Sequence, residues 1–411
     1  MTTDTNFDRG SGSSGTSIEA STWSRGDTYR TIAAAILALS LLAGAYVLSG
    51  TEGTGAQASF SLLIGAALGL IFERARFCFF CIFRDAIEDK NTTPLLSVLT
   101  AIAAGSIGYA ILFGQFLPDT STEFFPPNAH IGPVSWVLIL AGLLFGLGMT
   151  LSGACISGHI YRIGQGSLRA IPALLGSLIG FGLGFASWNS LYLSALSEAP
   201  KTWLPHTFGY AGSLVITFAI LGAIYLFARK WGTSSENISA PATGSLYTRL
   251  IINRWPPLLS GALVGIVGTV AYLRIEPLGV TRQLSTTART LLSDRGYLPE
   301  TLEGLDVMKG CIAVISSTIT NNGWLIIGIL VASLAAALAG NRFKLQEITL
   351  RNGFTALLGG ILLGWSSMIA LGCTVGVLLS GTQAFALSGW VFCATVFIGT
   401  VLGVKLKLHK L

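Results

Sequence analysis

The sequence predicts an all-α protein that crosses a membrane many times. Only 11% of its 411 residues are Asp, Glu, Lys or Arg, whereas soluble domains carry roughly 25%. It holds 50 glycines, about 12% against a usual level near 7%, and glycine lets membrane helices approach each other closely. A spanning helix needs roughly 20 apolar residues. About ten candidate spans are present, at 31–49, 58–72, 94–115, 134–151, 169–189, 208–228, 256–273, 323–340, 353–371 and 386–404.

The basic residues are divided unevenly between the two sides of the predicted membrane. When the predicted spans are followed in order, 19 of the 25 Lys and Arg residues fall on the side of the N-terminus. Cytoplasmic loops carry such an excess, so we expect a multi-pass membrane protein, surrounded by lipid, with both termini in the cytoplasm. The same distribution accounts for the net charge of +6 without nucleic acid as a partner.

The order of the spans predicts two inverted repeats with broken or re-entrant helices. The odd helix at 208–228 reverses the direction of the second set, and a shift of 218 positions aligns Cys155 with Cys373 and Gln165 with Gln383. Inverted repeats with interrupted helices are common in transporters. The predicted divisions are a disordered tail at 1–28, an extra N-terminal helix and loop at 29–57 that we expect to be retained rather than cleaved, a first repeat at 58–207, a connecting helix and cytoplasmic linker at 208–255, and a second repeat at 256–411.

Two aligned segments each place a cysteine where one helix stops and a short one begins. They are GMTLSGACISGHIYRIGQGS, which contains Cys155, and SMIALGCTVGVLLSGTQ, which contains Cys373. The free N–H groups of a helix N-terminus favour an anion, and a thiol is a soft, weak donor that stays mostly neutral. The alternative is that both cysteines pack as small apolar residues. We expect the residues supporting them to be Gly153, His159, Gln165 and Gln383.

A third segment, FERARFCFFCIFRD, surrounds Cys78 with basic residues. Arg74, Arg76 and Arg84 would lie at the cytoplasmic mouth, and Arg282 at the opposite mouth. Basic residues at a mouth raise the local concentration of anions. The alternative is that the arginines near Cys78 only anchor the helix on the positively charged side of the membrane.

Cys78 and Cys81 also have the C-x-x-C spacing of redox and metal sites. A second such pair, which a zinc site would need, is absent from the sequence. A membrane thiol–disulfide protein that uses these two cysteines remains an alternative from a different class. The sequence holds no P-loop, HExxH or GxSxG motif, so we expect no enzyme activity, no metal and no cofactor.

Taken together, these motifs resemble the YeeE/YedE sulfur-transport family. The resemblance rests on RARFCF with FRD, on GMTLSGAC with GH and RIGQGS, and on ALGCTVGVLLSGTQAFALSGWVF, and it covers about 58–408. It implies an hourglass-shaped protein of the bacterial cytoplasmic membrane that imports thiosulfate. It also implies a line of cysteines that pass the anion by S–H hydrogen bonds, at Cys78, Cys155, Cys311 and Cys373. Some relatives are associated with selenium compounds or with a cytosolic TusA-like sulfur carrier, so both stay open as alternative substrate and partner.

Overall fold

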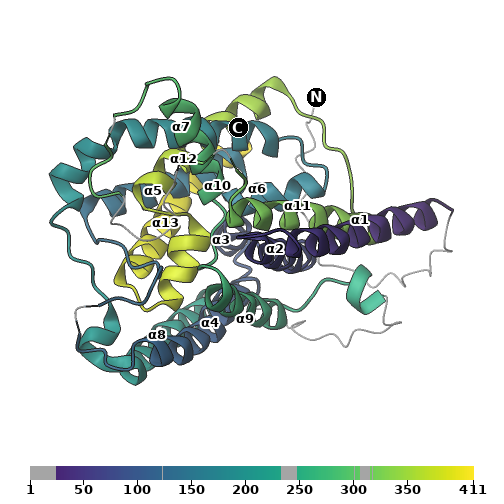
Figure 1. Ribbon diagram of the computed structural model, residues 1–411. Helices are drawn as coiled ribbons and strands as arrows, with labels where there is room; N and C mark the ends of the chain where they lie inside the picture. The colour runs from purple at the N-terminus through teal and green to yellow at the C-terminus, as the bar shows by residue number, and fades with distance from the viewer. Residues whose placement is uncertain (1–24, 123, 233–247, 300, 306–314, 317) are drawn as a thin grey trace.

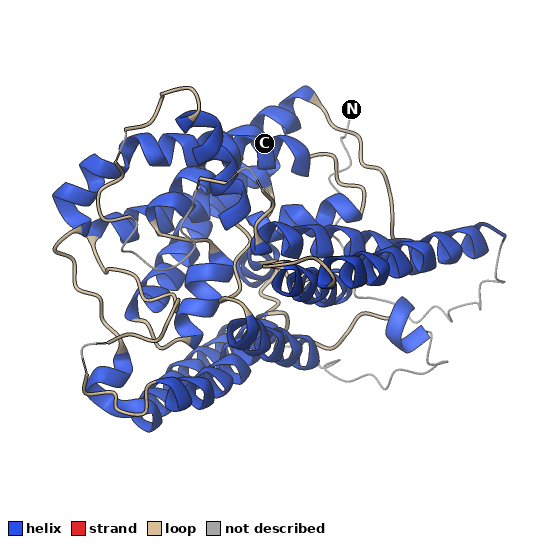
Figure 2. Ribbon diagram, in the orientation of Figure 1, coloured by secondary structure: helices blue, strands red, loops and turns tan. Residues whose placement is uncertain are grey.

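The computed structural model describes residues 25–122, 124–232, 248–299, 301–305, 315–316 and 318–411, and within them it is helical without strands (Figures 1 and 2). Ten helical segments of this described part are long and apolar enough to cross a membrane, which confirms the predicted all-α, multi-pass class. The helices that form their bulk are α1 (Arg25–Ser49), α2 (Gly55–Ala75), α4 (Leu95–Phe116), α5 (Trp136–Ser152), α7 (Ala170–Leu191), α8 (Leu204–Trp231), α9 (Pro257–Arg274), α11 (Asn321–Ala339), α12 (Leu350–Ile369) and α13 (Leu387–Lys405).

Among the short helices of the described chain, four of eight residues or more interrupt this series, and each follows a long helix. They are α3 (Phe79–Glu88), α6 (Ile156–Gly164), α10 (Arg282–Ser293) and η3 (Thr374–Gly381). Left-handed residues end the long helices α2 and α5, at Arg76 with φ 53° and at Gly153 with φ 89°. A left-handed residue satisfies the last carbonyls of a helix and redirects the chain. The chain can therefore stop a helix and begin another without a long connection.

The long helices pair in the way that two repeats of opposite direction would produce. α2 packs on α11 as α9 packs on α4, and α7 packs on α12 as α13 packs on α5. If α2, α4, α5 and α7 are exchanged for α9, α11, α12 and α13, each of these contacts becomes its counterpart. The contact between α5 and α12 is its own counterpart, because the exchange replaces each of these two helices with the other. The pairing fits the predicted inverted repeats.

Glycines bring the paired helices into backbone contact. A Cβ atom at Gly65 of α2 would collide with the carbonyl oxygen of Leu325 in α11, and one at Gly265 of α9 would lie 2.6 Å from the carbonyl oxygen of Ala101 in α4. In lipid, apolar helices have no hydrophobic driving force for association, so van der Waals packing at small residues stabilises their contact. The high glycine content therefore serves both halves of the molecule in the same way.

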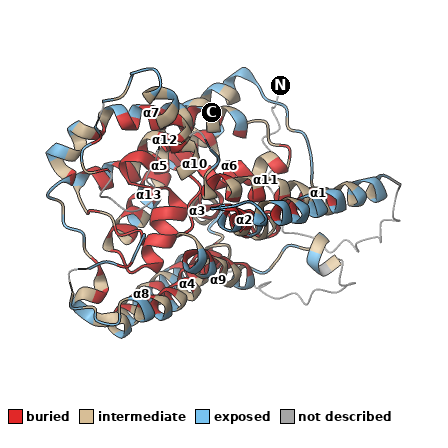
Figure 3. Ribbon diagram, viewed as in Figure 1, coloured by how far each residue is buried: buried red, intermediate tan, exposed pale blue. Residues whose placement is uncertain are grey.

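Buried residues gather around the short helices, while the outer helices are largely exposed (Figure 3). On α1, Leu39 and Tyr46 expose 64% and 81% of their surface, which suits a lipid-facing helix. Within the described residues this helix already includes Arg25, four residues before the predicted boundary at 29, and Asp27 in this turn interacts favourably with the helix dipole. Most of the tail predicted to be disordered lies outside the described residues.

The contact between α4 and α9 predicts the effect of a larger side chain. Gly265→Leu should push the two helices apart and cost about 1–3 kcal/mol, as overpacked cores do. We expect a lower thermal unfolding midpoint in detergent. Gly222→Leu in α8, where nothing lies within 4 Å of an added Cβ, is the matched control and should leave the midpoint unchanged. Equal midpoints for both variants would contradict this account of the packing.

Candidate functional site

Three cysteines lie at the N-terminal ends of three short helices. Cys78 directly precedes α3, Cys155 precedes α6 and Cys373 precedes η3. All three are completely buried, so none faces lipid. Helix N-termini leave backbone N–H groups without partners inside the helix. At the N-termini of α3, α6 and η3 a cysteine sulfur lies close to these N–H groups.

Two of these helix N-termini converge on Cys155. Its sulfur lies 4.0 Å from the sulfur of Cys78 and 3.3 Å from the hydroxyl oxygen of Ser157. The backbone N–H groups of Phe79, from α3, and of Gly158, from α6, also donate to it. These N–H groups therefore place positive partial charge around the thiol pair.

The surroundings of Cys373 repeat this arrangement in the second half of the chain. Its sulfur accepts hydrogen bonds from the backbone N–H groups of Val375 and Gly376, at the start of η3. Val280, just before α10, supplies a third N–H group. Each half of the chain thus holds one sulfur between the beginnings of two short helices.

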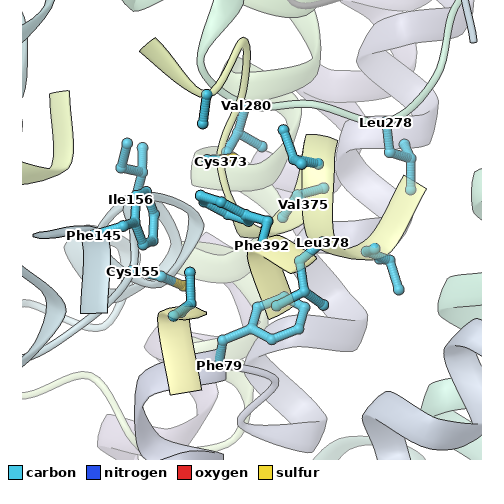
Figure 4. Packing of buried hydrophobic residues seen from close by; sticks show 14 of the residues in the cluster. Phe79, Phe145, Cys155, Ile156, Leu278, Val280, Cys373, Val375, Leu378 and Phe392 are labelled. Carbon is cyan, nitrogen blue, oxygen red and sulfur yellow. The ribbon is translucent and has the colours of Figure 1, made fainter. Parts of the chain in front are cut away.

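Apolar side chains close the space around Cys155 and Cys373. Figure 4 shows both cysteines among Phe145, Phe392 and Ile156. The rings of Phe145 and Phe392 are 5.7 Å apart and both are fully buried. In this conformation the two sulfur sites are therefore sheltered from water.

A cavity of about 270 Å³ opens near the thiols, at the end of the molecule where α2 finishes. It is here named the basic cavity, and it is lined by Glu73, Arg76, Tyr161, Arg162, Gln165, Ser167, Arg254, Asn341, Arg342, Lys344 and Gln346. The guanidinium of Arg342 donates hydrogen bonds to both carboxylate oxygens of Glu73, at 2.6 and 3.0 Å. Arg162 connects the cavity to the thiols, because its Nη2 lies 2.7 Å from the sulfur of Cys81.

The arginines predicted near the mouths have different surroundings. Arg76 lines the basic cavity. Arg74 is buried beside Glu73, at 3.7 Å, and Arg84 forms an ion pair with Asp85 at 2.8 Å. The anchoring alternative therefore describes Arg74 and Arg84 better than attraction of an anion. On the opposite side of the molecule, Arg282 forms an ion pair with Glu276, which reduces its positive field.

The two glutamines aligned by the repeat have different environments. Gln165 lines the basic cavity and hydrogen-bonds Glu73. Gln383 is fully buried, and its Nε2 donates to the carbonyl of Ala101 in α4 at 2.9 Å. Gln165 can therefore contact a molecule in the cavity, whereas Gln383 ties η3 to a neighbouring helix.

The remaining predicted residues support the break between α5 and α6 or lie outside the described chain. The carbonyl of Gly153 accepts a hydrogen bond of 3.2 Å from Arg162. His159 is 3% exposed, and its ring interacts with the backbone of Ala154. Cys311 falls among the residues that the structure does not describe.

Sequence reasoning missed Arg162 and gave Cys81 no part in the path. Arg162 follows Cys155 by seven residues, and residues seven apart lie on one face of a helix. That spacing could have identified it. Arg254 and Arg342 gave no such signal, because each reaches the cavity from a segment distant in sequence.

The ten apolar spans, the sulfur atoms at helix N-termini and the cationic cavity describe a membrane transport protein rather than an enzyme. The comparisons with known proteins agree. The profile of the Sulphur transport family matches residues 74–402, and this chain belongs to that family, as the YeeE/YedE resemblance indicated.

Two similar proteins are named for thiosulfate. The thiosulfate transporter TsuA of Escherichia coli (strain K12) is 27% identical over 82% of this chain and 91% of its own length. Thiosulfate transporter TsuA of Spirochaeta thermophila is 28% identical over 82% of this chain and 94% of its own length. The probable transporter YedE of Escherichia coli (strain K12) is 30% identical over 44% of this chain and 43% of its own length.

The closeness of the two sulfurs predicts a strict size limit at Gly158. An added Cβ there would lie 2.8 Å from the sulfur of Cys78 and 3.4 Å from that of Cys155. Gly158→Ala should therefore push the thiols apart and lower the yield of a Cys78–Cys155 disulfide under mild oxidation, measured by peptide mass spectrometry. Gly222→Ala is the control and should match the wild type. An unchanged yield in Gly158→Ala would show that the thiols do not pack as described.

A buried histidine in the loop between α4 and α5 predicts acid sensitivity. Burial and the nearby Arg282 lower the pKa of His130 to about 4, from a usual value near 6.5. Because the unfolded chain binds this proton more readily, stability should be full above about pH 6.5 and fall toward pH 4. A shift of this size corresponds to roughly 3 kcal/mol. His130→Gln should flatten the decline of the unfolding midpoint between pH 6.5 and 4, and an unaltered pH dependence would contradict the assignment.

Proposed function

We propose that this protein carries thiosulfate, or a closely related sulfur-containing anion, across the bacterial cytoplasmic membrane. The observation that carries the proposal is the pair of sulfur sites, in which Cys155 beside Cys78 and Cys373 in the other half each receive backbone N–H groups from two short helices. The names of the two relatives that span most of this chain give independent support.

Such sites suit an anion with a terminal sulfur. Backbone N–H groups stabilise negative charge, and a neutral thiol can donate a weak S–H hydrogen bond to a soft acceptor. Because the thiols are neutral donors, binding to them stays weak enough for the anion to leave, as conduction requires. The 4.0 Å between the sulfurs of Cys78 and Cys155 would let one thiol take over the anion from the other. Sulfate has a similar charge but carries an oxygen in place of the soft terminal sulfur.

The proposed orientation has both termini in the cytoplasm. Arg30, near the start of α1, hydrogen-bonds Asn341 after α11, and Asn341 also lines the basic cavity. The excess of basic residues thus lies at the end of the molecule that holds the start of α1, as expected for a cytoplasmic face. In this arrangement residues 58–207 and 256–411 form the two inverted repeats.

Uptake of labelled thiosulfate into liposomes that contain only this protein tests the proposal. Cys155→Ala and Cys373→Ala should each lower the initial rate at least tenfold, because each removes the S–H donor of one site. Cys393→Ala, which changes a partly exposed thiol in α13 that receives no backbone N–H group, should leave the rate unchanged. Excess sulfate should compete weakly. Uptake by the wild type also excludes an obligatory role for a TusA-like carrier.

The redox alternative has one observation in its favour, the grouping of Cys78, Cys81 and Cys155. It would replace the transport proposal if uptake survives in Cys155→Ala while thiol–disulfide exchange with an external dithiol depends on Cys78 and Cys81. Faster uptake of selenite than of thiosulfate would instead favour the selenium-compound alternative.

A further inference from the structure

The basic cavity holds a large excess of positive charge over negative charge. Its lining includes one carboxylate, Glu73, and five cationic side chains, which are Arg76, Arg162, Arg254, Arg342 and Lys344. These five come from the ends of α2 and α6, from the segment before α9 and from the turn after α11. Like charges this close repel one another in a partly buried site, so their convergence calls for a negative partner.

Glu73 does not supply enough negative charge. Both of its oxygens are held by Arg342, and Arg74 lies 3.7 Å from one of them. The nearby Asp85 is paired with Arg84 at 2.8 Å. Glu73, the one carboxylate in the lining, can therefore offset only one of its five cations.

Crowding of the cations is visible at Arg254. Burial and the neighbouring Arg76 lower the pKa of Arg254 to about 10, although a guanidinium normally keeps its proton above pH 12. A negative ion between these side chains would offset the repulsion and favour the charged form of Arg254. The volume of about 270 Å³ exceeds the roughly 30 Å³ that one water occupies in the liquid, so a small anion fits with part of its hydration.

Arg162 shows where such an anion would meet the thiols. Its side chain lies within the span Trp136–Gly164, and its guanidinium contacts the carbonyl of Gly153 and the sulfur of Cys81. Both are neutral, and a thiol is a weak acceptor. A guanidinium offers five donors in a fork that fits an oxyanion. An incoming oxyanion can therefore displace Cys81 and form stronger, charge-assisted hydrogen bonds.

We propose that the basic cavity is a binding site for a small divalent oxyanion, and that Arg162 receives this anion at the boundary between the cavity and Cys78, Cys81 and Cys155. The inference deepens the proposed function, on which it rests for the identity of the ion as thiosulfate. The cavity binds by charge and oxygen geometry, so it accepts sulfate as well as thiosulfate. Preference for sulfur then arises at the thiols.

Titration calorimetry on the full-length protein in detergent tests the site, with sodium thiosulfate and sodium sulfate as probes at constant ionic strength. Arg162→Gln and Arg254→Gln should each weaken binding of both anions at least tenfold. Arg162→Lys, which keeps the charge and loses the fork, should give a smaller loss. Arg351→Gln is the matched control, because Arg351 is exposed in the first turn of α12 outside the cavity, and its affinity should stay within twofold of the wild type.

The same variants separate this inference from the transport proposal. Cys155→Ala should abolish uptake in liposomes and still bind both anions normally in detergent, because the cavity is intact. A wild type that binds anions through Arg162 and Arg254 but does not transport thiosulfate would refute transport alone. Wild-type affinity in Arg254→Gln and Arg162→Gln, or no binding to the wild type, overturns the cavity site even if uptake is observed. Arg254 lies in a loop, so its variant keeps the test valid if Arg162→Gln fails to fold.

Discussion

The convergence of short-helix N-termini on buried sulfur atoms is the interaction on which the remaining structure depends. Phe79 and Gly158 direct their N–H groups to Cys155, and Val280 and Gly376 direct theirs to Cys373. Unpaired N–H groups inside a membrane cost several kcal/mol each, so chain breaks at this depth need an acceptor. The thiols are weak acceptors that a stronger one can replace.

The long helices keep these breaks in place. Backbone contacts at glycines fix α2 against α11 and α9 against α4, and such contacts leave little freedom for sliding. The short helices α3 and α10 follow α2 and α9. The short helices α6 and η3 follow α5 and α12, which also meet at glycines, at Gly148 and Gly359. The start of each short helix therefore has a fixed position. The geometry of the sulfur sites therefore depends on glycines at the helix contacts as well as on Gly158 beside the sulfurs themselves.

The sequence alone predicts the class, the spans and the cysteines at helix starts, because hydropathy and small residues before Cys155 and Cys373 are local signals. It does not predict the basic cavity. Glu73 and Arg342 are 269 positions apart, and nothing in their local sequence indicates that they meet. Arg74 and Arg84 have the same local appearance as Arg76, yet packing turns two of the three away from the cavity. Gln165 lines the cavity and Gln383 bonds a neighbouring helix, and this difference likewise depends on tertiary contacts that the local sequence does not indicate.

The two halves of the molecule match in backbone but not in charge. The shift that aligns Cys155 with Cys373 places Ser380 opposite Arg162, and Ser380 bonds the carbonyl of Leu278, while Arg282 at that end is neutralised by Glu276. An ion would consequently dwell longer at one end of the path than at the other. A longer residence of the ion at one end changes the rates of inward and outward transport by the same factor. The equilibrium ratio of its concentrations on the two sides of the membrane therefore does not change. Without an energy source, sustained inward flow would then depend on chemistry that consumes the ion on the far side.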